Sequence, residues 1–368
     1  MRIGIDARML DNTGIGRYLH NLLIHLARLD TRNDYVIFVN QENSRPVAQS
    51  NFTFIPLKRR VPLYSLQEQY WLPWEIRRQK LDLMHYPNFA IPLLQSCPYI
   101  VTIHDLIYYL YPDQCPSKTA HYYARGMLRY AVNHARTVIT VSHHSKHDLL
   151  TAFQIPSEAI RVILQAADDR CGCASQDTAT RNQVLQSYGI EPPYILYVGK
   201  HHPYKNIKTL LYAYAAHRDV FDRFQLVIAG RRDPRQHDLY ETARRLEAGH
   251  RIRFTDFVPE QDVFALYQGA QLFVFPSLYE GFGLPPLEAM ACGVPVITSN
   301  AASLPEVVGD AALQVPPTDV AALAGAMRRV LSDHTLWTTL KQKGLKRAQQ
   351  FSWETAAIQL LQVYLQHA

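Results

Sequence analysis

The sequence predicts an α/β protein with two doubly wound, Rossmann-like domains that face each other across a central cleft. Short apolar runs typical of buried parallel strands alternate with longer helix-like stretches along the chain. This alternation stops in a polar stretch over residues 167–181 and then starts again, which indicates two successive domains. A length of 368 residues with 48% hydrophobic residues is enough for each domain to bury its own core.

Each predicted element follows from this alternation. In the first half, strands are expected at 3–6, 35–39, 81–85, 99–103 and 138–141, with helices at 18–28, 66–79, 118–133 and 145–152. In the second half, strands are expected at 194–198, 224–229, 252–254, 272–275, 294–298 and 312–315, with helices at 284–292, 321–331 and 353–365. We therefore expect domains over residues 1–172 and 182–351. Because parallel strands end at one edge of a sheet, the residues that follow them should lie at the cleft.

Composition excludes several classes of protein. No apolar run is long enough to cross a membrane, and the chain starts with a charged strand rather than a signal peptide, so we expect a cytosolic protein. The five cysteines are too few and scattered for a disulfide framework. The net charge of +6 lies mostly in residues 1–170. Since no nucleic-acid-binding motif is present, an anionic membrane surface fits this basic half better than a nucleic acid.

The most informative segment is 276–297, in which Glu280 and Glu288 are separated by seven residues. It follows a predicted buried strand, and a glycine-containing turn leads into a helix. Backbone amides at such a helix start favour an anion, and a carboxylate accepts hydrogen bonds from adjacent hydroxyls. The pattern therefore indicates a ligand with phosphate in the middle and sugar at both ends, such as a nucleotide-sugar. From the spacing alone, an ordinary strand-to-helix turn with solvated glutamates remains open.

The whole of this segment resembles the signature of retaining glycosyltransferases of family 4. The resemblance implies the GT-B fold, in which the N-terminal domain binds the acceptor and the C-terminal domain binds the nucleotide-sugar donor. It also implies that the last helix, 352–368, crosses back to the N-terminal domain. Glu288 is then expected to bind the ribose diol and Glu280 the hydroxyls of the donor sugar. The phosphates would contact the amides at the helix start, which are those of Phe282, Gly283 and Leu284.

Two lysines are the second element of the predicted site. Lys200 and Lys205 lie between a predicted strand and a helix, where family 4 has Gly-Arg or Gly-Lys followed five positions later by Lys. Fixed cations at this place stabilise the charge that develops on a leaving diphosphate. Lys200 stands where Arg is commoner, so a point charge replaces a bidentate fork. The alternative for each is a solvated surface lysine.

Four further residues are assigned through the same resemblance. Gly14, Gly16 and Arg17 belong to a Gly-Ile-Gly-Arg-Tyr sequence, similar to the loop with which bacterial family 4 enzymes cover the donor diphosphate, and Arg17 is expected near the acceptor. Glycines there let the backbone approach a ligand closely, although a plain tight turn is the alternative. Val258 resembles the place where the family binds the base through backbone atoms.

His104 and Asp105 follow the predicted strand 99–103. A lone histidine at a strand end is more often a satisfied core residue. The family, however, often has a histidine here that reaches the transferred sugar, so we expect His104 at the site. Asp105 would orient this histidine or contact the acceptor.

Together these features predict a retaining, metal-independent hexosyltransferase that acts on a saccharide or lipid-linked saccharide. The loop at Gly14 and the His-Asp-Leu sequence resemble bacterial mannosyltransferases of polysaccharide and O-antigen synthesis, which favours GDP-mannose over UDP- or dTDP-sugars. No Asp-x-Asp sequence is present to hold a metal, so no cofactor is expected. The alternatives are a GT-B nucleotide-sugar epimerase, a non-catalytic nucleotide-sugar-binding subunit and, least favoured, a dinucleotide dehydrogenase.

Residues 58–78 alternate aromatic side chains with cations. Such a segment could lie on the inner face of a membrane and deliver a lipid-linked acceptor. The alternative is a core-facing helix with basic ends.

Overall fold

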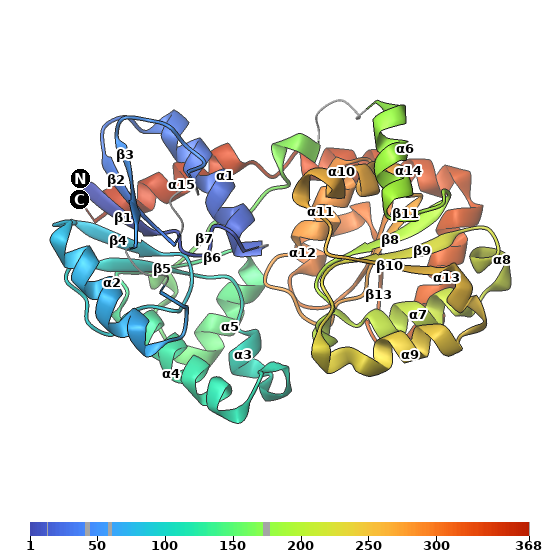
Figure 1. Cartoon of the computed structure of the whole chain (residues 1–368), viewed down its shortest axis with the longest axis horizontal. Helices are drawn as coiled ribbons and strands as arrows, with labels where there is room; N and C mark the ends of the chain where they lie inside the picture. Colours follow the sequence, from blue (N-terminus) through green and yellow to red (C-terminus); the bar gives the residue numbers. More distant parts are fainter. Residues whose placement is uncertain (13, 41–44, 58–60, 172–176, 368) are drawn as a thin grey trace. The chain divides into compact units, whose positions relative to one another are not determined.

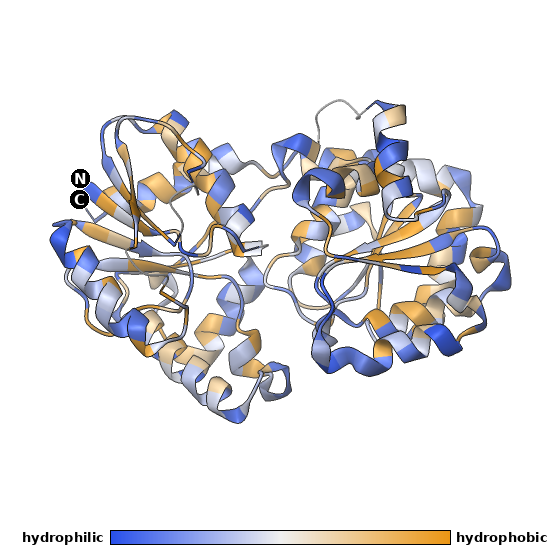
Figure 2. Ribbon diagram, in the orientation of Figure 1, coloured by the Kyte–Doolittle hydropathy of each residue, from blue (hydrophilic) through white to orange (hydrophobic). Residues whose placement is uncertain are grey.

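The computed structural model describes residues 1–12, 14–40, 45–57, 61–171 and 177–367. The chain divides into two compact units (Figure 1). Unit 1 comprises Met1–Gln165 and Ser352–Ala368, and unit 2 comprises Ala166–Phe351. In each unit, helices cover both faces of a parallel sheet (Figure 1), and the strands of that sheet are predominantly apolar (Figure 2).

The sheet of unit 1 has seven parallel strands in the order β3-β2-β1-β4-β5-β6-β7. The strands are β1 Arg2–Asp6, β2 Asp34–Val39, β3 Phe52–Pro56, β4 Leu83–Tyr86, β5 Tyr99–Ile103, β6 Thr137–Thr140 and β7 Ile160–Val162. The main helices are α1 Gly14–Leu29, α2 Leu66–Arg78, α3 Ile107–Leu110, α4 Lys118–His134, α5 His143–Phe153 and α15 Trp353–Leu365. The strand order changes direction between β1 and β4, which defines the switch point of this sheet.

Helices from different parts of the chain cover the two faces of this sheet. On one face α1 packs against α15 (Figure 1), and Trp353 and Tyr364 of α15 are among the fully buried side chains. On the other face, Leu72 of α2, Met127 of α4 and Leu149 of α5 belong to one apolar cluster with residues of the strands. The last helix therefore contributes to the core of unit 1.

The sheet of unit 2 has six parallel strands in the order β10-β9-β8-β11-β12-β13. They are β8 Tyr194–Val198, β9 Gln225–Ala229, β10 Ile252–Asp256, β11 Leu272–Phe275, β12 Val296–Ser299 and β13 Leu313–Val315. The helices are α6 Thr178–Ser187, α7 Ile207–Ala215, α8 Arg218–Phe221, α9 His237–Arg245, α10 Glu260–Gly269, α11 Leu284–Ala291, α12 Leu304–Val308, α13 Val320–Ser332 and α14 His334–Ala348. Helices α7, α9 and α13 pack on one face, and α6, α10, α11 and α14 on the other (Figure 1). The switch point lies between β8 and β11.

Two features differ from the sequence-based expectation. Strands β3 and β7 were not predicted, because both lie at sheet edges and are partly exposed, so neither is a continuous apolar run. The first unit also ends earlier than the expected limit at residue 172, at Gln165. The chain enters unit 2 at Ala166, where the Arg170 guanidinium pairs with the carboxylates of Asp168 at 2.7 Å and of Glu260 at 3.1 Å. The pair with Glu260 attaches residues 166–171 to α10.

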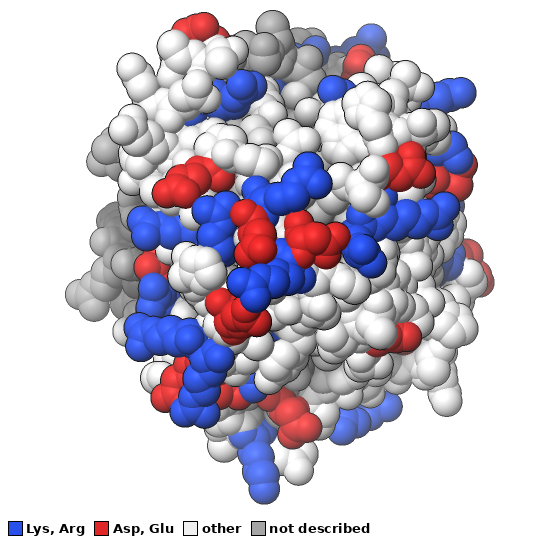
Figure 3. Space-filling view, turned by 90° about the vertical axis from the view of Figure 1, so that its right-hand side faces the viewer, with Lys and Arg blue, Asp and Glu red and all other residues white. Residues whose placement is uncertain are grey.

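Charges on the end of unit 2 that carries α8 are mixed in sign (Figure 3). Arg218 of α8 pairs with Asp222 at 3.4 Å and with Glu247 at 3.1 Å. Opposite charges therefore lie side by side on this face. In the described part of the chain, no helix is both long and apolar enough to span a membrane.

Candidate active site

The loops that follow β8 and β11 are joined at the switch point of unit 2. The Asn206 side-chain amide donates a hydrogen bond to the Pro276 carbonyl at 3.0 Å, and the Leu278 amide donates to the Tyr204 carbonyl at 2.8 Å. Asn206 has a φ of 58°, a left-handed conformation that asparagine tolerates better than most residues. The two loops thus form one edge at the place where open α/β sheets bind ligands.

Lys205 and Glu280 meet across this edge. The Lys205 Nζ donates to Glu280 Oε1 at 2.6 Å, and the two side chains are only 13% and 12% exposed. The Lys205 ammonium also lies 5.2 Å from the centre of the Phe275 ring. An anion that binds Lys205 therefore has to compete with Glu280 for it.

Two further cations lie close to Lys205. Partial burial, together with the charges of Arg231 and Lys205, lowers the pKa of Lys200. The Arg231 guanidinium lies 4.5 Å from the centre of the Phe257 ring. Among the described residues, neither Lys200 nor Arg231 has a carboxylate partner, so the ends of β8 and β9 carry uncompensated positive charge. Arg231 was given no role from the sequence. The signal that could have identified it is its place two residues after β9, the strand next to β8.

Glycine at position 230 allows the loops after β8 and β9 to pack closely against each other. A Cβ atom on Gly230 would lie 1.9 Å from the Gly199 carbonyl oxygen, and Gly230 has a φ of 145°. The Gly199 amide donates to the Ala229 carbonyl at 2.9 Å, and the His201 amide donates to the Arg231 carbonyl at 3.0 Å. The backbones after β8 and β9 are therefore in direct contact, which brings Arg231 toward Lys200.

The start of α11 presents the predicted phosphate-binding amides. Gly283 is the N-cap residue and has a φ of 118°, where glycine is favoured. Prolines follow Leu284 at the next two positions and carry no N–H group, but their fixed φ suits a helix start. The amides at this end are thus limited to those of Leu284 and the residues just before it. The Ser303 hydroxyl lies 2.7 Å from the Phe282 carbonyl and supports the turn.

Glu288 and Val258 are both buried in unit 2. The Glu288 side chain belongs to a residue that is 1% exposed, and its Oε2 accepts a hydrogen bond of 3.0 Å from the Tyr267 hydroxyl on α10. Tyr267 thus fixes the orientation of this carboxylate. Val258 follows β10 and is 7% exposed, so any contact with a ligand through this residue would use its backbone.

His104 and Asp105 lie at the end of β5 in unit 1. The His104 Nε2 donates to the Pro87 carbonyl at 3.1 Å, and its Nδ1 lies 3.2 Å from the Gln165 side-chain amide; these partners assign the tautomer. Burial lowers the pKa of His104 to about 4, so its imidazole is neutral near pH 7. Asp105 accepts a hydrogen bond from the Ile107 amide at the start of α3.

Gly14, Gly16 and Arg17 form the start of α1 in unit 1 rather than a loop. A Cβ atom on Gly16 would lie 2.4 Å from the Leu10 carbonyl oxygen, so this glycine is required for packing. A Cβ atom on Gly14 would have no described atom within 4 Å, which leaves open space at the helix start. Arg17 is half-buried, and its carbonyl accepts a hydrogen bond from the Asn21 side chain.

Comparison with known proteins gives consistent matches over both units. Residues 12–170 match the family model Glycosyltransferase Family 4, and residues 181–347 match the model Glycosyl transferases group 1. O-antigen chain mannosyltransferase B from Escherichia coli is 34% identical, with 96% of each chain covered. O-antigen chain mannosyltransferase RfbU from Salmonella typhimurium is 29% identical and covers 73% of this chain and 71% of its own.

Solved structures share the same fold at low sequence identity. Sucrose-phosphate synthase from Thermosynechococcus elongatus has a TM-score of 0.77 at 23% identity, and covers 100% of this chain and 98% of its own. HepE from Anabaena, solved with UDP and glucose, has a TM-score of 0.78 at 18% identity over 100% of both chains. With two family models matched and a relative 34% identical along almost its whole length, the chain belongs to glycosyltransferase family 4 and is a glycosyltransferase of the GT-B fold.

Proposed function

We propose that this glycosyltransferase binds its nucleotide-sugar donor at the carboxyl edge of the unit 2 sheet. The observation that carries the proposal is the group of three cations at the switch point, of which Lys200 and Arg231 lack carboxylate partners among the described residues. Lys200 and Lys205 would hold the diphosphate together with the amides of Phe282, Gly283 and Leu284. A fixed positive charge there stabilises the leaving diphosphate more in the transition state than in the ground state.

The two glutamates would bind the sugars at either side of the phosphates. Glu280 would contact hydroxyls of the donor sugar once an anion has displaced it from Lys205. Glu288, oriented by Tyr267, would accept hydrogen bonds from the ribose diol. Val258 would bind the base through its backbone, and Gly14 and Gly16 would approach the diphosphate from unit 1. His104 is proposed to contact the transferred sugar as a neutral imidazole.

We further propose that the donor is GDP-mannose and that mannose is transferred with retention to a saccharide or lipid-linked saccharide of a bacterial surface polysaccharide. Support comes from the names of the two O-antigen mannosyltransferases to which the chain is similar. Retention is what the family resemblance implies, and it would proceed by front-face attack assisted by the leaving phosphate. Asp105 and Arg17 are the proposed contacts of the acceptor.

No metal is needed in this proposal. The sequence lacks an Asp-x-Asp motif, and the cations at the edge of the sheet supply the charge that a divalent ion would otherwise provide. We therefore expect transfer to be unaffected by EDTA. Complete loss of activity that manganese restores would refute metal independence while leaving the proposed donor site intact.

Thermal-shift screening followed by a transfer assay tests the function. GDP-mannose should stabilise the protein more than UDP-glucose, UDP-N-acetylglucosamine, dTDP-glucose or NAD, and NMR of the product should show a retained anomeric configuration. Turnover of UDP-N-acetylglucosamine without an acceptor would favour the epimerase. Stabilisation by a nucleotide-sugar without any turnover would favour the binding subunit. A preference for NAD would overturn the proposal.

Peripheral membrane association is proposed for α2. One face of this helix packs in the core through Leu72 and Ile76. Its remaining surface exposes large apolar side chains, with exposed fractions of 89% for Leu66, 70% for Tyr70 and 46% for Trp74. The helix ends in two arginines, and the preceding cations at 58–60 lie outside the described residues. Aromatic residues beside cations suit the interface of an anionic membrane.

Vesicle flotation tests this association. The protein should float with vesicles that contain anionic lipid and less with neutral ones, and the double variant Trp71→Ser, Trp74→Ser should lose this binding. Tyr212→Ser, which removes an exposed aromatic side chain from α7 in unit 2, is the matched control and should float like the wild type. If the double variant floats with anionic vesicles as well as Tyr212→Ser does, α2 does not contact the membrane and is a core-facing helix with basic ends.

A further inference from the structure

A cluster of aromatic side chains lies near the carboxyl edge of the unit 1 sheet. The Tyr64 ring centre is 5.5 Å from that of Phe89 and 6.2 Å from that of Tyr123, the latter in an edge-on arrangement. Tyr64 and Tyr123 remain 43% and 37% exposed. These three rings come from the loop before α2, the loop after β4 and helix α4. They lie against one another and remain partly exposed to solvent.

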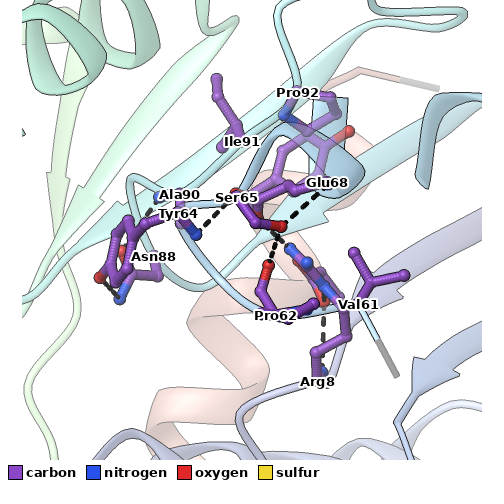
Figure 4. Close-up of polar contacts among 12 residues, drawn as sticks. Arg8, Val61, Pro62, Tyr64, Ser65, Glu68, Asn88, Ala90, Ile91 and Pro92 are labelled. Carbon is purple, nitrogen blue, oxygen red and sulfur yellow. Dashed lines mark hydrogen bonds and ion pairs between the residues drawn. The ribbon is translucent and has the colours of Figure 1, made fainter. Parts of the chain in front are cut away.

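Polar groups adjoin this cluster at the switch point of the sheet. The Asn88 side-chain amide, two residues after β4, lies 3.5 Å from the Tyr64 hydroxyl (Figure 4). It also lies 3.3 Å from the sulfur of Met9, a residue that follows β1. Both contacts are weak for an amide donor, so its N–H groups gain little from the protein. Asp105 lies two residues after β5, the strand that pairs with β4, so it lies at the same edge of the sheet as Asn88.

Tyr64 is held in a strained backbone conformation. Its φ of 60° lies in the left-handed region, which is unfavourable for a bulky side chain and is often found at functional sites. The Tyr64 amide donates to Glu68 Oε2 at 2.9 Å, and Ser65 caps the following helix. The loop is therefore fixed by Glu68 rather than by the preference of its own residues (Figure 4).

Glu68 is itself held by a buried ion pair. The Arg8 Nη2 donates to Glu68 Oε1 at 2.6 Å and to Asp6 Oδ2 at 2.7 Å, and the side chains of Arg8 and Glu68 are completely buried. The Arg8 Nη1 is buried and has no hydrogen-bond partner among the described residues. Burying such charges is costly, and well-packed apolar residues often stabilise a fold as well or better. Fold stability alone therefore accounts poorly for this arrangement, whereas the position of Tyr64 depends on it.

We propose that Tyr64, Phe89 and Tyr123 form a platform on which one sugar ring of the acceptor stacks, with Asn88 and Asp105 binding its hydroxyls. A sugar ring has an apolar face of C–H groups and an edge of hydroxyls, which matches a surface of aromatic faces beside an amide and a carboxylate. Arg8 and Glu68 act as positioning residues for Tyr64. The inference rests on the proposed function only in calling this saccharide the acceptor.

Saturation-transfer NMR on the full chain tests the platform, with mannotriose, maltotriose and chitotriose as probes. At least one should bind the wild type, and Tyr64→Ala and Tyr123→Ala should each weaken that binding about tenfold, since one aromatic contact is worth up to that factor. Tyr122→Ala removes the neighbouring tyrosine of α4, which is 71% exposed, and should bind like the wild type. Binding of none of the probes, or equal binding by all variants, overturns the proposal.

Parallel thermal shifts with GDP-mannose separate this proposal from the proposed function. The alanine variants should be stabilised by GDP-mannose as much as the wild type is. If GDP-mannose fails to stabilise even the wild type while the saccharide results hold, the donor assignment fails and the platform stands. If the variants lose vesicle binding instead of saccharide binding, the cluster contacts the membrane and the platform is wrong.

Two further variants test the positioning of Tyr64. Glu68→Gln should weaken saccharide binding while stabilisation by GDP-mannose persists. If that variant does not fold, Tyr64→Gly and Tyr64→Ala still decide. Both remove the ring, but glycine at a φ of 60° relieves the strain, so Tyr64→Gly should unfold at a higher temperature than Tyr64→Ala. The reverse order would show that Tyr64 is not held under strain.

Discussion

Replacing Glu280 by Gln is expected to strengthen the binding of GDP and to weaken transfer. Lys205 Nζ is 2.6 Å from Glu280 Oε1, and both side chains are largely shielded from water. A hydrogen bond to a charged group contributes about 1.5–3 kcal/mol. Gln can still accept a hydrogen bond from Lys205, but it carries no charge. We therefore take about 1.4 kcal/mol of this hydrogen-bond free energy as lost in the variant, and this amount no longer opposes the binding of a phosphate to Lys205. That amount corresponds to about tenfold tighter binding of GDP.

Isothermal titration calorimetry with GDP measures this change, and a transfer assay with GDP-mannose measures the loss of turnover. If Glu280 contacts the donor sugar, transfer should fall about 10²-fold, the order of magnitude found when one hydrogen bond to a transition state is removed. Asp238→Asn is the matched control, because it breaks the exposed pair between Lys208 and Asp238 on the helices after β8 and β9. It should leave the affinity for GDP unchanged. Unchanged or weaker binding of GDP to Glu280→Gln would refute the idea that Lys205 is released to the phosphates.

Three other predictions concern unit 2. Burial lowers the pKa of His201 from 6.5 to about 4. As the pH falls through this window the unfolded state takes up a proton first, so the free energy of unfolding should decrease, by about 2 kcal/mol at a pH of about 5. Urea unfolding should show less of this decrease in His201→Gln; an identical pH dependence would contradict it. Gly283→Ala should destabilise by about 1–3 kcal/mol because its φ is 118°, whereas Gly325→Ala in the middle of α13 should not destabilise. Equal melting temperatures for these two variants would count against a strained N-cap. Tyr267→Phe removes the hydroxyl that orients Glu288 and should weaken GDP binding, as measured by calorimetry, whereas unaltered affinity would argue against a ribose contact.

The meeting of Lys205 and Glu280 at the edge of the unit 2 sheet could be predicted because the determinants of the strands and helices around them are local. The apolar run 272–275 coincides with β11, and the helix expected from residue 284 starts there. Parallel strand order then brings Lys205 and Glu280 together although they are 75 residues apart. The ends of parallel strands fix where the following residues lie, so the positions of the motifs in the sequence predict which residues are close in space.

Contacts between loops could not be predicted in this way. The pair between Arg8 and Glu68 joins residues 60 positions apart, and no periodicity links them. The left-handed backbone of Tyr64 is likewise imposed by Glu68 and has no signal of its own, since turn positions with positive φ usually carry Gly or Asn. For His104, the hydrogen-bond partners are the Pro87 carbonyl and the Gln165 side chain, which are 17 and 61 residues away. Tertiary packing decides each of these cases.

The two sheets use charged side chains for different purposes. At the edge of unit 2, Lys200 and Arg231 have no carboxylate partners among the described residues, and Lys205 is paired with Glu280. In unit 1, the guanidinium of Arg8 is completely buried and holds Glu68, which fixes the loop at Tyr64. A diphosphate is attracted by uncompensated positive charge, whereas a neutral saccharide requires a fixed surface of rings and hydrogen-bonding groups. The distribution of charge is thus consistent with the proposed donor site in unit 2 and the proposed saccharide site in unit 1.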